Sequence, residues 1–304
     1  MAWREEYWKS IKSFDTEEKL DLYFYRPVGF VIAKAAFPLR LTPTILTLIG
    51  LALGVASGFF FYDNDSNVSL AIASVLFVLA GIFDSSDGQM ARMGGKSTRF
   101  GLVLDGLCDN FVFLSAYVGS TLNLVPAYGY WIWPVAVFAG LCHSCQSSLL
   151  DFYNRDYLYF GCGKVNGDYW NPTLAEVEAG RRSGPAGERF LWEIRFSWLW
   201  QQNTLSNRAA ALRLRWREIN AGPRAEEFQA IYRDHNRTIL RFWRLMGANF
   251  HTILIITAAF ARRFDLYLIL GDILFLTAAL LVLRVAQKRS DEKLVAALAA
   301  KGLA

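Results

Sequence analysis

Long apolar segments separated by short polar turns fill most of the chain. A helix needs about 20 mostly apolar residues to cross the roughly 30 Å hydrocarbon core of a bilayer. The segments that reach this length lie at about residues 42–62, 68–93, 99–122, 127–153, 240–261 and 265–286. The pattern therefore predicts an all-α integral membrane protein with six transmembrane helices.

The remaining residues divide the chain further. Residues 1–40 mix aromatic and charged side chains, which is typical of an amphipathic segment at the membrane interface. Spans 1 to 4 fall within residues 41–158, spans 5 and 6 within 239–287, and a polar tail occupies 288–304. The connection at 159–238 holds Gly and Pro clusters, the aromatic run FLWEIRFSWLWQQ and the Arg-rich run NRAAALRLRWREINAG. It is longer than loops in compact domains and too aromatic to be disordered, so we expect a helical cytoplasmic insertion.

Composition and charge agree with a membrane location and suggest an orientation. Of the 304 residues, 54% are hydrophobic, and the opening MAWREEYWKSIKSF lacks the apolar core and cleavage site of a signal peptide. We therefore expect a multi-pass protein that keeps its N-terminus.

Basic residues gather on one side of the expected six-span arrangement. Both termini, the 93–98 turn and the long connection share this side, whereas the other side holds the acidic turn at 63–67 and only Arg262 and Arg263. The positive-inside rule places the basic side in the cytoplasm, and a bacterial inner membrane suits the arrangement. The net charge of +5 then reflects orientation and anionic headgroups, and we expect no nucleic-acid partner.

The cysteines and histidines give a weaker signal. The chain has 4 cysteines, of which Cys142 and Cys145 form the tetrapeptide CHSC around His143. A structural zinc site needs four ligands in a closed tetrahedron, and no second CxxC or His pair follows, so we expect these thiols to pack in an apolar helix. His251, alone in an apolar run, is expected to be a satisfied core residue.

The stretch FDSSDGQMARMGGKSTRFGLVLDGLCDN, residues 83–110, places carboxylates at helical spacing beside a short turn. On the second span the spacing is i, i+3, i+4 and i+7, and on the third it is i, i+4 and i+8, so each set lies on one helix face. The two sets comprise Asp84, Asp87, Gly88 and Ala91, and Gly101, Asp105 and Asp109. A short turn makes the two helices antiparallel neighbours, and the carboxylates therefore converge near the cytoplasmic end.

Carboxylates in this position are costly unless something neutralises them. A charged Asp at a helix centre costs about 2.5–3.5 kcal/mol, and two carboxylates 4 Å apart repel by roughly 4 kcal/mol at an effective dielectric near 20. Protonation relieves the repulsion, but a divalent cation relieves it better, because Arg92 is the only fixed positive charge nearby. Oxygen ligands select Mg²⁺, Ca²⁺ or Mn²⁺. Four carboxylates suit two ions, an arrangement used in phosphoryl displacement.

The small residues on the same faces leave a slot beside the carboxylates. Gly88, Ala91 and Gly101 would admit a flat base or a phosphate chain, although small residues also serve close helix packing in membranes. Packing by itself leaves the carboxylates without a purpose.

This stretch resembles the signature of the CDP-alcohol phosphotransferase family, D-x2-D-G-x2-A-R-x8-G-x3-D-x3-D. The matching positions are Asp84, Asp87, Gly88, Ala91, Arg92, Gly101, Asp105 and Asp109. The resemblance covers roughly residues 25–155 and, more weakly, the last two helices, while the insertion at 159–238 departs from most members. It implies that a CDP-linked alcohol or lipid gives its phosphoalcohol to an acceptor hydroxyl and releases CMP.

The resemblance also implies roles for individual residues. Asp84, Asp87 and Asp105 would hold two Mg²⁺ or Mn²⁺ ions, and Asp109 would be the general base that also touches the second metal. The residues implied for the CDP moiety are Gly88, Ala91, Gly101 and, near a phosphate, Arg92. The family's Thr-Pro-Asn at the start of the first helix appears here as LTPT, in which Thr44 replaces the Asn. Members of the family form homodimers.

The sequence says less about the substrates. His143, Gln146, Ser147 and Asp151 recur at helical spacing and Arg155 follows; they form either an acceptor pocket or a set of interhelical hydrogen bonds. The basic insertion and Arg155 favour CDP-diacylglycerol with an inositol-phosphate type of acceptor, or contact with anionic membrane lipid. The alternative is a CDP-choline or CDP-ethanolamine type of donor with diacylglycerol or ceramide as acceptor.

Two functions of other classes compete with the enzyme. A cation channel or transporter also uses intramembrane carboxylates, but the chain shows no inverted repeat or broken midplane helix. A membrane scaffold could recruit partners through the Arg-rich insertion. Neither accounts for the Gly, Ala and Arg of the signature.

Overall fold

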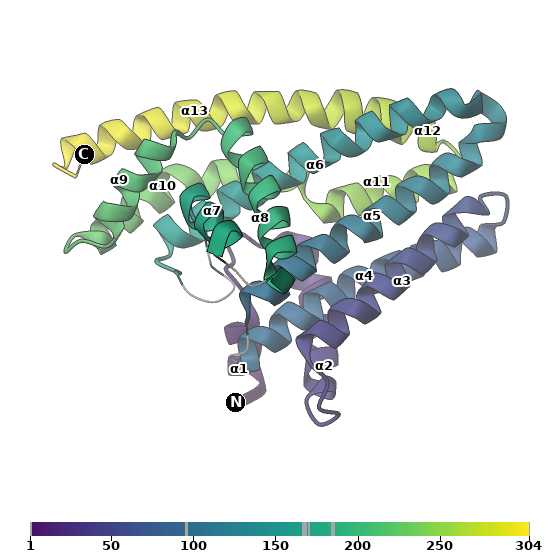
Figure 1. Ribbon diagram of the computed structural model, residues 1–304, viewed down its shortest axis with the longest axis horizontal. Helices are drawn as coiled ribbons and strands as arrows, with labels where there is room; N and C mark the ends of the chain where they lie inside the picture. Colours follow the sequence, from purple (N-terminus) through teal and green to yellow (C-terminus); the bar gives the residue numbers. More distant parts are fainter. Residues whose placement is uncertain (1, 95–96, 166–168, 170, 184–185, 304) are drawn as a thin grey trace. The chain divides into compact units, whose positions relative to one another are not determined.

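The computed structural model of the protein describes residues 2–94, 97–165, 169, 171–183 and 186–303, and all regular structure in these ranges is helical (Figure 1). The all-α prediction is thereby confirmed for this part of the chain. The helices group into two compact units, Met1–His143 with Ala248–Phe275, and Ser144–Gly247 with Leu276–Ala304. Each unit is described by itself below.

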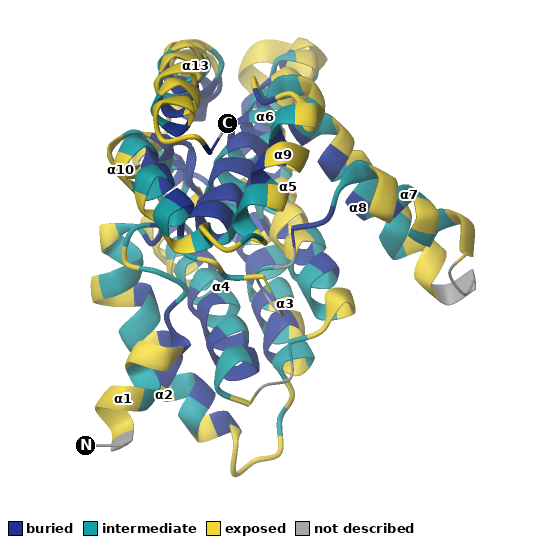
Figure 2. Ribbon diagram, turned by 90° about the vertical axis from the view of Figure 1, so that its left-hand side faces the viewer, coloured by how far each residue is buried: buried dark blue, intermediate teal, exposed yellow. Residues whose placement is uncertain are grey.

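The first unit contains the carboxylate-bearing helices. Its elements are α1 (Ala2–Ser10), η1 (Asp21–Tyr25), α2 (Arg26–Ala36), α3 (Pro43–Tyr62), α4 (Asn67–Gly94), α5 (Arg99–Tyr128), η2 (Gly129–Trp131), the first part of α6 (Ile132–Asp156), α11 (Ala248–Phe260), α12 (Phe264–Leu266) and most of η6 (Tyr267–Leu276). α3 packs against both α4 and α5, and α2 packs against α4. Buried and exposed positions alternate along α3 and α4 (Figure 2).

The helix starts on either side of the site are set by local sequence. Thr42 caps α3 by accepting a hydrogen bond from the Ile45 amide, and Pro43 takes the first helical position, where its missing N–H costs nothing. Thr98 caps α5 in the same way through the Gly101 amide at 3.0 Å. This cap sets the start of α5, and the start of the helix sets the turns on which Asp105 and Asp109 lie.

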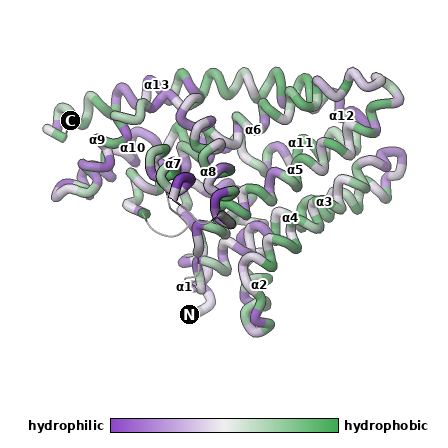
Figure 3. Tube along the Cα trace, in the orientation of Figure 1, coloured by the Kyte–Doolittle hydropathy of each residue, from purple (hydrophilic) through white to green (hydrophobic). Residues whose placement is uncertain are grey.

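In the part of the chain that the structure describes, four helical stretches are long and apolar enough to cross a membrane: Pro43–Tyr62, Asn67–Gly94, Arg99–Gly161 and Phe264–Ala300. Figure 3 shows α3 and α4 coloured mostly as hydrophobic. The third stretch joins the predicted spans at 99–122 and 127–153, because the turn between them is itself helical. These helices are what a multi-pass membrane protein requires.

The predicted span at 240–261 has different bounds. α10 (Ala225–Trp243) ends early, a short 3-10 turn follows, and Gly247 adopts an extended conformation before α11 begins at Ala248. α11 has 13 residues, about 20 Å of helix, which is shorter than a bilayer core. The break holds the apolar Leu245 and Met246 beside Arg244, so the average hydropathy of the segment does not reveal it.

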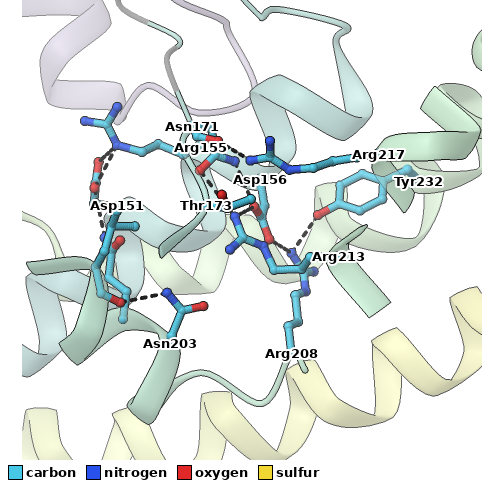
Figure 4. A network of polar contacts seen from close by, with 12 residues as sticks. Asp151, Arg155, Asp156, Asn171, Thr173, Asn203, Arg208, Arg213, Arg217 and Tyr232 are labelled. Atoms are coloured by element: carbon cyan, nitrogen blue, oxygen red, sulfur yellow. Dashed lines mark hydrogen bonds and ion pairs between the residues drawn. The ribbon is translucent and has the colours of Figure 1, made fainter. Parts of the chain in front are cut away.

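The second unit contains the predicted insertion, which is mostly helical. Its elements are the rest of α6, η3 (Tyr157–Gly161), α7 (Leu174–Ser183), α8 (Ala186–Leu205), α9 (Ala210–Asn220), α10, η5 (Arg244–Met246) and α13 (Thr277–Ala300). Arg208, between α8 and α9, bonds Asp156 of α6 and Asp291 of α13 (Figure 4 shows the Asp156 side). The insertion is therefore tied to the helices that precede and follow it.

The α3 and α5 helices meet backbone to backbone. A Cβ placed on Gly119 of α5 would lie 2.0 Å from the Gly58 carbonyl oxygen of α3, and one on Gly58 would lie 2.0 Å from Ser115 Oγ. Small residues permit such approaches between membrane helices.

We expect Gly119→Ala to destabilise the protein by about 1–3 kcal/mol, because overpacking against a backbone carbonyl cannot be relieved by a rotamer change. Gly140→Ala is the matched control, since no atom lies within 4 Å of its added Cβ and Ala has the higher helix propensity. Thermal unfolding in detergent micelles, followed by tryptophan fluorescence, measures both. Equal unfolding midpoints for the two variants would contradict the close contact.

Candidate metal and nucleotide site

Three carboxylates from two helices meet in the first unit. Asp84 and Asp87 on α4 and Asp105 on α5 each offer one oxygen, and these oxygens lie within 4.8 Å of one another. Asp109 lies one turn further along α5 and shares the lining of a cavity with Asp84. The helical spacing explains this geometry, because residues three and four apart lie on one helix face.

The carboxylate cluster fits a divalent cation. Oxygen donors suit Mg²⁺ and Mn²⁺, and Asp105 Oδ1 is buried without a hydrogen-bond partner among the described residues. Thr47 of α3 donates a hydrogen bond to Asp87 Oδ2, which orients that carboxylate. Thr47, one turn after Thr44 of the LTPT segment, is therefore the threonine of α3 that contacts the cluster.

The small residues of the signature leave space beside the carboxylates. The three atoms nearest to a Cβ built on Gly88 all belong to Arg92, and a Cβ on Gly101 would meet only Thr98 Oγ1 at 3.1 Å. Ala91 is buried on the same helix. The flexible end of Arg92, rather than a packed backbone, therefore bounds the space at Gly88, as a nucleotide slot would need.

Arg92 has a second role that the signature does not indicate. Its Nε donates to the Ser10 carbonyl oxygen at 2.5 Å, and Gln89 Nε2 donates to Ser10 Oγ at 2.9 Å. The end of α1 is thus fastened to α4 next to the carboxylates. Sequence reasoning missed this contact because no local pattern links residues so far apart.

The cavity beside the cluster has a volume of about 200 Å³ and is lined partly by the N-terminal segment. Arg26, Asp21 and Glu18 line it together with Asp84 and Asp109. None of these three was a candidate from the sequence. The charged residues of the amphipathic N-terminal segment give only a weak signal that some of them face the interior of the protein.

Arg26 is held beside the cluster by a buried ion pair. Its Nε lies 3.0 Å from Glu17 Oε2, and its Nη1 donates to Ser85 Oγ at 3.2 Å. Burial, the largest single effect, would raise the pKa of Glu17, but the attraction and hydrogen bond of Arg26, together with the charges of Lys12 and Arg92, hold the pKa below its ordinary value of 4.5. The ion pair therefore stabilises the fold when Glu17 is ionised.

This pair predicts a pH dependence. A depressed carboxyl pKa contributes stability that is fully present above pH 4.5 and is lost as the pH falls through the lower pKa of the folded protein. We expect Glu17→Gln to lower stability at pH 7 by about 1.5–3 kcal/mol, the usual worth of a hydrogen bond to a charged group, with the gap to wild type closing below pH 4.5.

Unfolding midpoints measured across this pH range test the prediction. Glu5→Gln, which changes an exposed carboxylate in α1, should follow wild type throughout. A gap for Glu17→Gln that persists unchanged into acid would mean that charge is not its cause.

The residues predicted for the acceptor each have a partner within their own unit. His143 belongs to the first unit and is buried beside Tyr117, whose hydroxyl lies 3.3 Å from His143 Nδ1. Gln146 belongs to the second unit and bonds Thr277 Oγ1 at 3.3 Å. Asp151 and Arg155, also in the second unit, form an ion pair at 2.8 Å (Figure 4). Their role in acceptor binding stays a prediction.

Positive charge is crowded around Asp151. Trp198 Nε1 and Gln202 Nε2 of α8 donate to its carboxylate at 3.3 and 3.0 Å. Burial, and after it the neighbouring Arg155, lowers the pKa of Arg195 on the same helix to about 9. A pKa lowered in this way means that the charged guanidinium is destabilised, and an anion placed beside it would relieve the cost.

Comparisons with known proteins agree with the geometry of the carboxylate site. Residues 40–159 match the family model described as CDP-alcohol phosphatidyltransferase. A phosphatidylinositol phosphate synthase of Mycolicibacterium smegmatis is 40% identical over 90 residues, 30% of this chain and 39% of that protein. One of Corynebacterium glutamicum is 33% identical over 112 residues, 36% of this chain and 50% of that protein.

A more distant relative has a different name. The "Bifunctional IPC transferase and DIPP synthase" of Aquifex aeolicus is 29% identical over 109 residues, 36% of this chain and 24% of that protein. No solved structure matches the chain. The chain spans half or less of the length of these curated relatives.

The segment that carries the carboxylates belongs to the CDP-alcohol phosphatidyltransferase family. The relatives from Mycolicibacterium smegmatis and Corynebacterium glutamicum are named as phosphatidylinositol phosphate synthases. The resemblance inferred from the eight signature positions is thereby confirmed.

Proposed function

We propose that this protein is a divalent-metal-dependent CDP-alcohol phosphotransferase of phospholipid synthesis. The observation that carries the proposal is the meeting of Asp84, Asp87 and Asp105 within 4.8 Å on two helices of the matched segment. A cation channel would also explain buried carboxylates, but not the space at Gly88 and Gly101 beside them.

The residues divide the chemistry between them. Asp84, Asp87 and Asp105 would hold two Mg²⁺ or Mn²⁺ ions, which neutralise the charge of the donor diphosphate and of the departing CMP. Asp109, on the cavity side, accepts the proton of the acceptor hydroxyl. The deprotonated acceptor oxygen forms a bond to the phosphorus that carries the lipid alcohol. The bond between that phosphorus and the oxygen of CMP breaks, and CMP leaves.

The donor and acceptor that we propose are CDP-diacylglycerol and an inositol-phosphate type of alcohol. The names of the relatives support this choice. The six-span arrangement, cytoplasmic termini and a homodimer belong to the same proposal.

An assay of CMP release tests the reaction and its substrates together. Purified protein in mixed micelles receives CDP-diacylglycerol, CDP-choline or CDP-ethanolamine, each with inositol phosphate, inositol or diacylglycerol, and with Mg²⁺, Mn²⁺ or a chelator. We expect CMP only with CDP-diacylglycerol, inositol phosphate and a metal. Release from CDP-choline with diacylglycerol would overturn the substrate assignment, and no metal-dependent release from any pair would overturn the enzyme.

A further inference from the structure

A second polar cluster lies in the first unit and shares no residue with the carboxylate cluster. It comprises Tyr117 of α5, His143 of α6, His251 of α11, and Tyr267 and Asp272 of η6. All five are buried, and His251 and Asp272 are 0% exposed. Ionisable groups inside membrane helices are expensive and tend to mark function. The proposed phosphotransfer gives no role to Tyr117, His251, Tyr267 or Asp272, and His143 enters it only as a predicted acceptor residue.

Hydrogen bonds fix where the protons of the cluster lie. The Tyr117 hydroxyl donates to Asp272 Oδ2 at 2.6 Å, and it also lies 2.7 Å from the Tyr267 hydroxyl and 3.3 Å from His143 Nδ1. Tyr117 has one proton, so the other two contacts must be donated to its oxygen, by Tyr267 and by His143. Tyr267 then has no proton left for His251, whose Nδ1 lies 2.8 Å away. His251 therefore donates too.

Both histidines are thus assigned the tautomer that is protonated on Nδ1. Each Nε2 is left as a lone pair unless the ring is charged. The two rings are stacked, with centroids 3.6 Å apart and planes 7° from parallel, so two imidazolium charges would repel strongly here. Among the described residues none forms a hydrogen bond with His251 Nε2, which is buried.

A histidine that is protonated on Nδ1 and unprotonated on Nε2 is in the form that binds a metal ion. Metal-ligating histidines usually donate their other ring N–H to an oxygen, which fixes the tautomer, and the tyrosine hydroxyls accept in that position here. One ring nitrogen of His143, one ring nitrogen of His251 and one carboxylate oxygen of Asp272 lie within 4.8 Å of one another. Two imidazoles and a carboxylate suit zinc and other first-row transition ions.

We propose that His143, His251 and Asp272 bind one divalent transition-metal ion, Zn²⁺, at a site separate from the carboxylate cluster. The lone pairs of stacked rings lie in parallel planes, so one imidazole turns about its Cβ–Cγ bond when the ion binds, a torsion that is soft for histidine. The bound ion joins α6, α11 and η6. The oxygen-only cluster at Asp84 differs in ligand type, so the two sites select different metals.

Zinc content of the purified full chain tests the site without measuring activity. The protein, purified through a tag that lacks histidine, is stripped with chelator, given one equivalent of Zn²⁺ in excess Mg²⁺, and desalted before its metal is measured. We expect about one zinc per chain in wild type and in Asp84→Asn, and less than a tenth of that in His251→Ala. His235→Ala is the matched control, because His235 is the third of the 3 histidines and its ring bonds the Ile231 carbonyl on the same helix; this variant should keep its zinc.

The outcomes that would overturn the proposal are distinct. If Asp84→Asn loses the zinc and His251→Ala keeps it, the zinc is bound by the carboxylate cluster. If the wild-type protein retains no zinc, the proposed site does not exist. Asp272→Asn, which keeps nearly the same shape, guards against misfolding and should bind zinc at least tenfold more weakly. X-ray absorption at the zinc edge of wild type should show two imidazole ligands, and a spectrum without imidazole would contradict the assignment.

Discussion

Replacing Asp109 with asparagine should slow CMP release by about 10²–10⁴-fold, the usual contribution of a general base. Asparagine keeps the shape of the side chain but cannot take a proton from the acceptor hydroxyl. Asp109 lines the same cavity as Asp84, so an acceptor that enters this cavity comes within reach of its carboxylate. Initial rates at saturating Mg²⁺ or Mn²⁺ measure the effect.

Two comparisons separate the base from the metal ligands. Asp84→Ala and Asp105→Ala should abolish turnover at every metal concentration while the protein still folds and inserts. Asp65→Asn is the matched control, because Asp65 is an exposed carboxylate in the turn before α4, and it should keep the wild-type rate. Full activity in Asp109→Asn would exclude the assigned base, and full activity in Asp84→Ala would exclude the metal cluster.

Replacing Arg208 with alanine should destabilise the protein by about 3–5 kcal/mol, the cost of breaking a buried ion pair from one side. Arg208 is 1% exposed and bonds Asp156 at 2.9 Å and Asp291 at 2.8 Å. Its remaining donors reach the Tyr232 hydroxyl and Asn236 Oδ1. Without the guanidinium, Asp291 loses its arginine and Asp156 keeps only Arg213.

The geometry of the guanidinium should matter as well as its charge. Arg208→Lys restores the charge but cannot contact Asp156 and both oxygens of Asp291 in one plane, so we expect it to recover only part of the stability. Arg182→Ala, which breaks an exposed pair with Glu178, should cost no more than about 1 kcal/mol. Thermal unfolding in micelles compares the three variants, and equal losses for Arg208→Ala and Arg182→Ala would show that the buried network contributes nothing.

The sequence was most informative where a long periodic segment carried unusual residues. Helices α4 and α5 followed from apolar length, and the meeting of Asp84, Asp87 and Asp105 followed from spacing and a short turn. Both are local properties, because helical periodicity and turn length are written in consecutive residues.

Contacts between distant segments could not be read in this way. Arg26 faces the cavity because α2 packs against α4, and nothing near Arg26 in the chain indicates that partner. His251 was expected to be a satisfied core residue, whereas its Nε2 is buried without a partner among the described residues. The break at Gly247 was missed because hydropathy records apolar composition, and the backbone conformation of a single glycine leaves that composition unchanged.

The glycine contact between α3 and α5 bears on how a lipid-linked donor enters. At Gly119 the backbone of α5 touches the backbone of α3 at Gly58, so at this contact no side chain can change rotamer to let the helices separate or slide by small steps. We therefore expect α3 and α5 to keep their relative position while substrates enter and products leave. An opening of the cavity must then occur at contacts made by side chains, such as those of Arg26 and Asn249, which line it.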